Sequence, residues 1–145
     1  MDRQPAANFT QPPLRFATTD WAERDRFEAI REIYGRTIVR MDLEPVGHEP
    51  LALEATLQAL PGLGIAHVNC TKAELRRTPR HLVNDDFIFS INLSGQRRIL
   101  QYGREITVGA GDAVLQTGGD VTAGQIDHSH FLAFRMPAKD RKSVV

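Results

Sequence analysis

The stretch Phe87–Asp112, FIFSINLSGQRRILQYGREITVGAGD, carries the clearest pattern in the chain. Up to Gly95 it alternates apolar residues with smaller polar ones, which is typical of a strand with one buried face; the apolar positions are Phe87, Phe89, Ile91 and Leu93. Two shorter strand-like runs follow, separated by Gly103 and ended by a Gly-Ala-Gly-Asp turn at 109–112. Glycine tolerates the positive φ of tight turns. Short strands at this spacing predict an antiparallel sheet closed into a barrel or sandwich.

The rest of the chain predicts one helix and further strands. Asp20 is a residue type that caps helix N-termini, and apolar residues recur at near-helical spacing from Trp21 to Tyr34, before Gly35. After Thr37 the apolar pattern changes to period 2 in most segments, which predicts about nine short strands after the helix. We therefore expect a mainly β protein, an antiparallel barrel with one N-terminal helix.

Length and composition predict one domain between two irregular ends. A chain of 145 residues can bury a single core. We expect residues 1–15, which are polar and contain three prolines, to form a flexible arm, residues 16–137 to form the barrel, and residues 138–145 to form a frayed tail.

Charge and cysteine content exclude several classes of function. Lys plus Arg and Asp plus Glu both number 18, so no net positive field would draw the chain onto DNA. Cys70 is the single cysteine, which excludes an internal disulfide and a multi-thiolate zinc site and suits a reducing compartment. The N-terminus lacks the apolar core of a signal peptide, and no apolar run approaches membrane-spanning length. We expect a cytoplasmic protein with no membrane contact.

Four segments, in this order, resemble a known family: TTDWAERDRFEAIREIYGR at 18–36, RRTPR at 76–80, QYGR at 101–104 and GAGD at 109–112. Together they resemble the N-terminal sensor domain of AraC-type transcription regulators, over about 16–137. The resemblance implies a cupin-like double-stranded β-helix that binds a small-molecule effector and helps the protein to form a homodimer. In that family a separate C-terminal domain with helix-turn-helix units binds DNA, and this sequence stops before such a domain. The chain is then either the sensor part of a longer regulator or a natural single-domain relative.

The same resemblance raises an alternative, because many cupins are metalloenzymes. The positions where cupin ligands fall hold Thr122 and Ile88, and only His81 lies near the place of an earlier ligand. With three of four ligands missing, we expect no metal and no other cofactor. His128 and His130 have the spacing of two ligands on one strand face, but no carboxylate or third histidine on that strand completes a site.

Catalytic chemistry is not expected, because no nucleophile with a base and no converging pair of carboxylates is visible. Two alternatives to the sensor domain stay open. One is a small metal-dependent cupin enzyme, such as a dioxygenase or isomerase, and the other is a stand-alone small-molecule-binding module.

The effector is expected inside the barrel. We expect its walls to include Phe87, Phe89, Ile91 and Ile99. Polar contacts are expected from His67 and Gln101, and a carboxylate contact from Arg77 if that side chain points inward. Each expectation has a structural alternative. His67 would be a core histidine bonded to a backbone carbonyl, Gln101 an ordinary polar strand residue, and Arg77 a partner of Asp85 or Asp86 in a salt bridge. The apolar side chains would then pack the barrel solid.

The helix also bears on assembly. Its apolar stripe from Trp21 to Tyr34 has a charged flank, and we expect one barrel to cover only part of that stripe. The uncovered part of the stripe would pack against a second copy, which predicts a weak to moderate homodimer.

Overall fold

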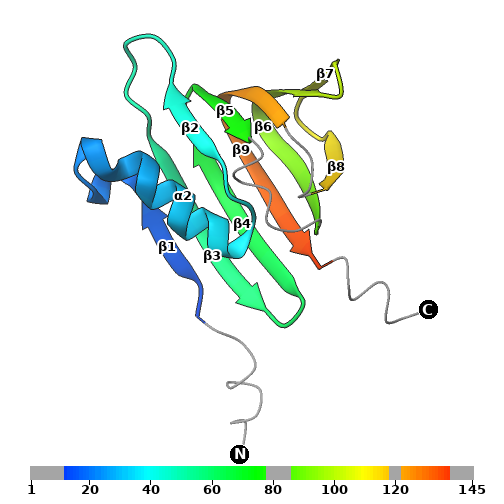
Figure 1. The fold of residues 1–145 in the computed structure, drawn as a ribbon, viewed down its shortest axis with the longest axis horizontal. Coiled ribbons are helices and arrows are strands. Elements are labelled where there is room, and N and C mark those ends of the chain that lie inside the picture. The colour runs from blue at the N-terminus through cyan, green and yellow to red at the C-terminus, as the bar shows by residue number, and fades with distance from the viewer. Residues whose placement is uncertain (1–11, 78–85, 118–121, 138–145) are drawn as a thin grey trace, which may run out of the picture.

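The structure is a computed structural model that describes residues 12–77, 86–117 and 122–137. Within these residues nine strands form one antiparallel sheet, and a single α-helix, α2, lies across one face of it (Figure 1). The elements are β1 (Leu14–Ala17), α2 (Arg26–Thr37), β2 (Asp42–Pro45), β3 (Leu53–Leu60), β4 (Leu63–Cys70), β5 (Ala73–Arg77), β6 (Phe87–Gln101), β7 (Arg104–Val108), β8 (Ala113–Thr117) and β9 (Thr122–Met136). The expected mainly β, antiparallel fold with one α-helix is confirmed.

Strands β6 and β9 hold the sheet together. The strand order is β1-β3-β4-β9-β5-β2, and β6 pairs with β7, β8 and β9. The first part of β9 pairs with β5 and the second part with β4. On its other side β9 pairs antiparallel with β6 along nearly the whole length of both strands. β9 therefore joins β5 and β2 to β4, β3 and β1, and one face of the sheet becomes the inside of the barrel.

Both long strands bend at the same place. Gly95 of β6 has φ +73° and His128 of β9 has φ 45°, and the pairing of the two strands shifts register between Asn92 and Gln96. A Cβ atom on Gly95 would lie 2.1 Å from the backbone oxygen of His128, so only glycine fits there. The sequence pattern predicts separate short strands on either side of Gly95. The glycine forms a β-bulge instead, and the strand continues through it.

The α-helix begins later than the capping pattern predicts. Residues Thr18–Asp20 and Glu23–Asp25 form two short 3-10 turns, and α2 starts at Arg26. Trp21 between the turns is extended, and its ring lies 6.3 Å from that of Phe16. Because Trp21 packs against β1, it lies outside the helix, and Asp20 does not cap α2.

The expected arm and tail lie mostly outside the described residues, which exclude 1–11 and 138–145. Leu14 and Arg15, at the end of the expected arm, belong to β1 and pair with β3.

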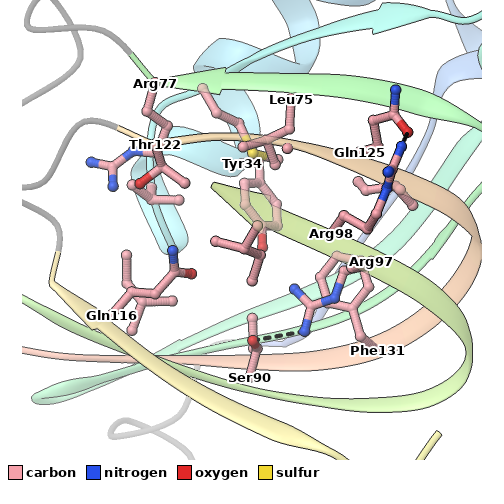
Figure 2. A pocket seen from close by; sticks show the side chains of 17 residues that line it. Tyr34, Leu75, Arg77, Ser90, Arg97, Arg98, Gln116, Thr122, Gln125 and Phe131 are labelled. Carbon is pink, nitrogen blue, oxygen red and sulfur yellow. Dashed lines mark hydrogen bonds between the residues drawn. The ribbon is translucent and has the colours of Figure 1, made fainter. Parts of the chain in front are cut away.

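The core lies between α2 and the inner face of the sheet. Its large apolar side chains that are at most 2% exposed include Ile30, Ile38, Leu43, Leu53 and Val68. Burial of each contributes about 1.5–3 kcal/mol to the stability of the fold. Tyr34 of α2 is also buried, and it reaches from the helix toward the far side of the barrel (Figure 2).

The inner face of β6 is the opposite of the expected one. Ile88, Ser90 and Asn92 are buried, at 7%, 2% and 0% exposure. The alternate positions, Phe87, Phe89, Ile91 and Leu93, lie on the outer face and are half-buried or exposed. The larger apolar residues were expected inside because burial of apolar area favours them there. Here the inner face instead carries a buried polar network.

Candidate functional site

The inside of the barrel contains a cavity of about 60 Å³, bounded by α2, the segment that follows it and strands β5, β6, β8 and β9 (Figure 2). This is room for a few water molecules or for one end of a small molecule. Apolar side chains form much of the wall, among them Val39, Met41, Leu75, Ile88, Ile99, Ile126 and Phe131. The polar side chains at the wall include Tyr34, Arg77, Ser90, Arg97, Gln116 and Thr122.

Arg97 is the buried cation of this cavity. Its side chain is fixed by three contacts and is only 9% exposed. Nε donates to Asn92 Oδ1 at 2.7 Å, and Nη2 donates to Ser90 Oγ at 2.9 Å. The guanidinium carbon lies 4.3 Å from the centroid of the Phe131 ring, which is within cation–π distance.

The β-bulge turns Arg97 inward. Before the bulge the inward residues of β6 are the even-numbered 88, 90 and 92, and after it they are Arg97 and Ile99. Strict alternation from Asn92 would have placed the neighbouring Gln96 and Arg98 inside. The single extra residue therefore decides which arginine is buried. Arg98 also lines the cavity wall, but about half of its side chain is exposed, and it bonds Gln125 and Glu105.

Asn92 holds the bulge and Arg97 together. It is completely buried, and its Nδ2 donates to the backbone oxygen of Gly95 at 2.9 Å and to that of Ser94 at 3.2 Å. Its Oδ1 accepts from Arg97 and also from Ser129 Oγ at 2.9 Å. Because both ends of the amide are bonded, this side chain has one orientation. The hydrogen bond from Arg97 Nε to Asn92 Oδ1 then fixes the position of the guanidinium.

The described part of the cavity wall carries arginine side chains and no carboxylate. Among the described residues no carboxylate forms a salt bridge with Arg97. Burial lowers the pKa of Arg97 and the nearby Tyr34 opposes that change, but a guanidinium stays charged in proteins. Burial also raises the pKa of the Tyr34 phenol, so that group is a neutral hydroxyl. Figure 2 shows the hydroxyl end of Tyr34 pointing into the cavity toward the side of Ser90 and Arg97.

Of the expected ligand-binding residues, Arg77 and Ile99 line the cavity. Arg77 is 4% exposed at the end of β5, where Nε donates to the backbone oxygen of Arg40 at 3.2 Å. Its strand partner is Thr122 of β9, which also lines the cavity.

The other expected residues lie elsewhere, and the expectation that they line the interior is corrected. Phe87, Phe89 and Ile91 are on the outer face because the inward positions of β6 alternate with them. His67 is exposed on the outer side of β4, and its Nε2 contacts Nε2 of His130. Gln101 is half-buried at the end of β6, away from the cavity, and no described residue accepts a hydrogen bond from its Nε2.

Thr122 and Ile88, which occupy the cupin ligand positions, both line the cavity. The described residues contain no group of three or more His, Cys, Asp or Glu arranged to hold a metal. Burial raises the pKa of Cys70 to about 12, so its thiol stays protonated and unreactive.

His128 and His130, whose spacing suggested a shared metal, contact different side chains. His128 Nε2 lies 3.6 Å from Glu49 Oε1, whereas His130 contacts His67. The positive φ of His128 breaks the strand alternation on which the expected pair depended. His81 and the segment 78–80 lie outside the described residues.

Comparison with known proteins identifies the family. The family model of the AraC-binding-like domain matches residues 30–143. The chain belongs to this family. The expected sensor-domain resemblance is thus confirmed. No curated protein sequence matches the chain significantly.

Solved structures share the fold. The AraC-like transcriptional activator CuxR aligns with a TM-score of 0.74 at 16% identity, over 88% of this chain and 48% of CuxR, so the chain spans about half of that protein. A putative ethanolamine utilization protein from Salmonella typhimurium LT2 aligns with a TM-score of 0.51 at 17% identity, over 67% of this chain and 80% of that one. At these identities the likeness concerns the fold alone, and the expected cupin-like barrel is confirmed. None of the described helices is long and apolar enough to cross a membrane.

Proposed function

We propose that this chain is the effector-binding domain of an AraC-type transcription regulator, and that the effector is a small molecule bound in the barrel cavity. One observation carries the site: a partly open, largely apolar cavity into which a buried arginine and a tyrosine hydroxyl project. Small-molecule sites commonly combine apolar walls with a few such polar groups. The family match supports the regulatory role.

The proposed mechanism is a population shift. The cavity lies between Tyr34 of α2 and Arg97 of β6, so a ligand that contacts both favours one position of the helix relative to the sheet. Coupling of that position to a DNA-binding domain would change DNA affinity.

DNA binding is assigned to a separate helix-turn-helix domain, since this chain has no net charge. We propose a cytoplasmic location. Residues 1–145 alone should not shift a promoter fragment at physiological salt, and a nanomolar shift would contradict this assignment.

The site is tested by thermal shift against small aromatic acids, amines and sugars. A true effector at about 100 times its Kd stabilises the fold by about 2.7 kcal/mol, or roughly 5–10 °C in melting temperature for a domain of this size. Ala133→Leu adds bulk to the cavity wall, whereas Phe89→Ala changes the outer face. The effector should stabilise wild type and Phe89→Ala but not Ala133→Leu. Equal stabilisation of all three would place its site outside the cavity.

No catalytic activity is proposed. The alternative of a small metal-dependent cupin enzyme requires bound metal, so elemental analysis separates the two functions. We expect iron, zinc, manganese and nickel each well below one equivalent, and no change of melting temperature with chelator. Stoichiometric metal that survives dialysis would favour the enzyme.

We also propose that two copies pair, but through the outer face of the sheet rather than through α2. Ala29, Ile30 and Tyr34 of α2 are buried within one barrel, and Phe27 and Ile33 are partly buried against the same core. The outer face, made by the outward side chains of β4, β6, β8 and β9, exposes Leu93 at 43% and Leu115 at 58%. Its apolar centre has no charge, so two copies can meet there without repulsion.

A further inference from the structure

We propose that the ligand of the cavity is an organic anion, a small carboxylate with an apolar body, bound by Arg97 and the Tyr34 hydroxyl. This inference rests on the proposed function, because it names the chemical class of the effector. It assigns the anion contact to Arg97, which the sequence pattern did not single out.

The first argument is charge. Arg97 is 9% exposed, and both of its side-chain hydrogen-bond acceptors, Asn92 and Ser90, are uncharged. No described residue accepts a hydrogen bond from its Nη1. A buried charge is costly unless an opposite charge pairs with it, and a carboxylate is the group that guanidinium binds best.

The second argument is that Asn92 and the bulge do not need this cation, although among the described residues Ser90 Oγ is bonded by Arg97 alone. Asn92 Oδ1 already accepts from Ser129 Oγ, and Asn92 Nδ2 has backbone acceptors in the bulge. An apolar side chain at position 97 would therefore leave the amide bonded. Arg97 is costly to bury and dispensable for the bulge, which points to a role in binding.

Tyr34 supplies a second donor. Its ring is buried in the barrel wall, and its hydroxyl has no hydrogen bond to any described residue. Figure 2 shows this hydroxyl on the side of the cavity where Arg97 lies. Because burial keeps the phenol protonated, it can donate to one carboxylate oxygen while Arg97 donates to the carboxylate.

The remaining walls select an organic rather than an inorganic anion. Met41, Leu75, Ile99 and Ile126 form an apolar surface around the rest of the cavity. A bare phosphate would leave that surface uncovered, whereas a small ring or short chain would bury it. The cavity volume of about 60 Å³ limits this body to a small one.

The experiment uses matched charged and neutral probes. Benzoate, phenylacetate and hexanoate are each compared with their primary amides by calorimetry and thermal shift, with inorganic phosphate as a further arm. At least one carboxylate should bind wild type at least tenfold more tightly than its amide and than phosphate.

Variants then locate the anion. Arg97→Met should reduce carboxylate affinity at least tenfold and leave amide affinity unchanged. Tyr34→Phe, which keeps the ring, should reduce it about fivefold. Arg104→Met is the control, because it removes the same charge from the exposed β6–β7 hairpin and should change nothing. Without ligand, Arg97→Met should melt at the wild-type temperature or above, whereas an arginine needed for the fold would melt lower when replaced.

The outcomes separate this inference from the proposed function. Amides that bind in the cavity as tightly as the acids would overturn the inference that the ligand is an anion. They would still support the cavity as the effector site. Carboxylate binding that survives both Arg97→Met and Tyr34→Phe would also overturn it. The inference requires that the fold does not depend on Arg97. An Arg97→Met variant that does not fold would therefore overturn it. Failure of every acid and amide to bind would count against both proposals.

Discussion

At the scale of single residues, the interior of the barrel depends on Asn92 more than on any large apolar side chain of β6. This amide is completely buried and bonds Gly95, Ser94, Arg97 and Ser129. Removing it leaves buried donors without acceptors, which costs more than the bonds themselves contribute.

Asn92→Ala should therefore lower the free energy of unfolding by about 2–4 kcal/mol. Urea denaturation measures this difference. Asn69→Ala is the matched control, because Asn69 is exposed on the outer side of β4, and its loss should cost less than about 0.5 kcal/mol. Similar losses for the two variants would contradict the role given to Asn92.

Cys70 offers a second test at this scale. Burial raises the pKa of its thiol from 9.0 to about 12. The unfolded thiol ionises first as pH rises, so this group's contribution to stability is complete below pH 9 and is lost between pH 9 and 12. At pH 8 a thiol reagent such as Ellman's should label Cys70 only as fast as the protein unfolds. Rapid labelling of the folded protein would show that the thiol is accessible.

At the scale of elements, the bulge explains which parts of the site could be predicted from the sequence. The strand pattern and Gly95 are visible in the sequence, and Ile99 and Arg77 were expected in the pocket and line it. Arg97 was missed because a bulge shifts the alternation by one residue, and period-2 reasoning cannot show where the extra residue falls.

The inward face of β6 was predicted wrongly for a different reason. Apolar area favours the phenylalanines inside, but the buried Asn92 network and the Tyr34 ring occupy part of that side. Contacts between residues distant in sequence decided the face, and the local pattern does not contain them.

Gly95→Ala tests the bulge directly. The positive φ and the close backbone oxygen of His128 together should cost about 2 kcal/mol or more, because backbone strain and a forced backbone shift add. Gly103→Ala separates these two effects, since Gly103 has the same φ of +73° but nothing within 4 Å of its added Cβ. It should cost only about 1 kcal/mol in urea denaturation. Equal costs would mean that the close approach to β9 does not matter.

At the scale of the whole molecule, the sheet has two unlike faces. The helix α2 lies across the inner face (Figure 1), which also lines the cavity, whereas the outer face exposes apolar side chains. Phe89 and Phe134 lie side by side on this outer face, with ring centroids 6.4 Å apart. A sensor domain that pairs through the outer face would keep its cavity accessible while two copies assemble.

Pairing through the outer face gives the last prediction. Leu93→Glu and Leu115→Glu place a charge in the centre of the proposed contact, where a second copy would bring a like charge close. Each should shift the protein from dimer to monomer in sedimentation velocity at micromolar concentration. Ile106→Glu is the control, because Ile106 on β7 is similarly exposed, at 47%, but lies outside the proposed contact. A wild-type protein that stays monomeric at high micromolar concentration would refute the pairing. A dimer broken only by Ile106→Glu would move the interface to the β6–β7 hairpin.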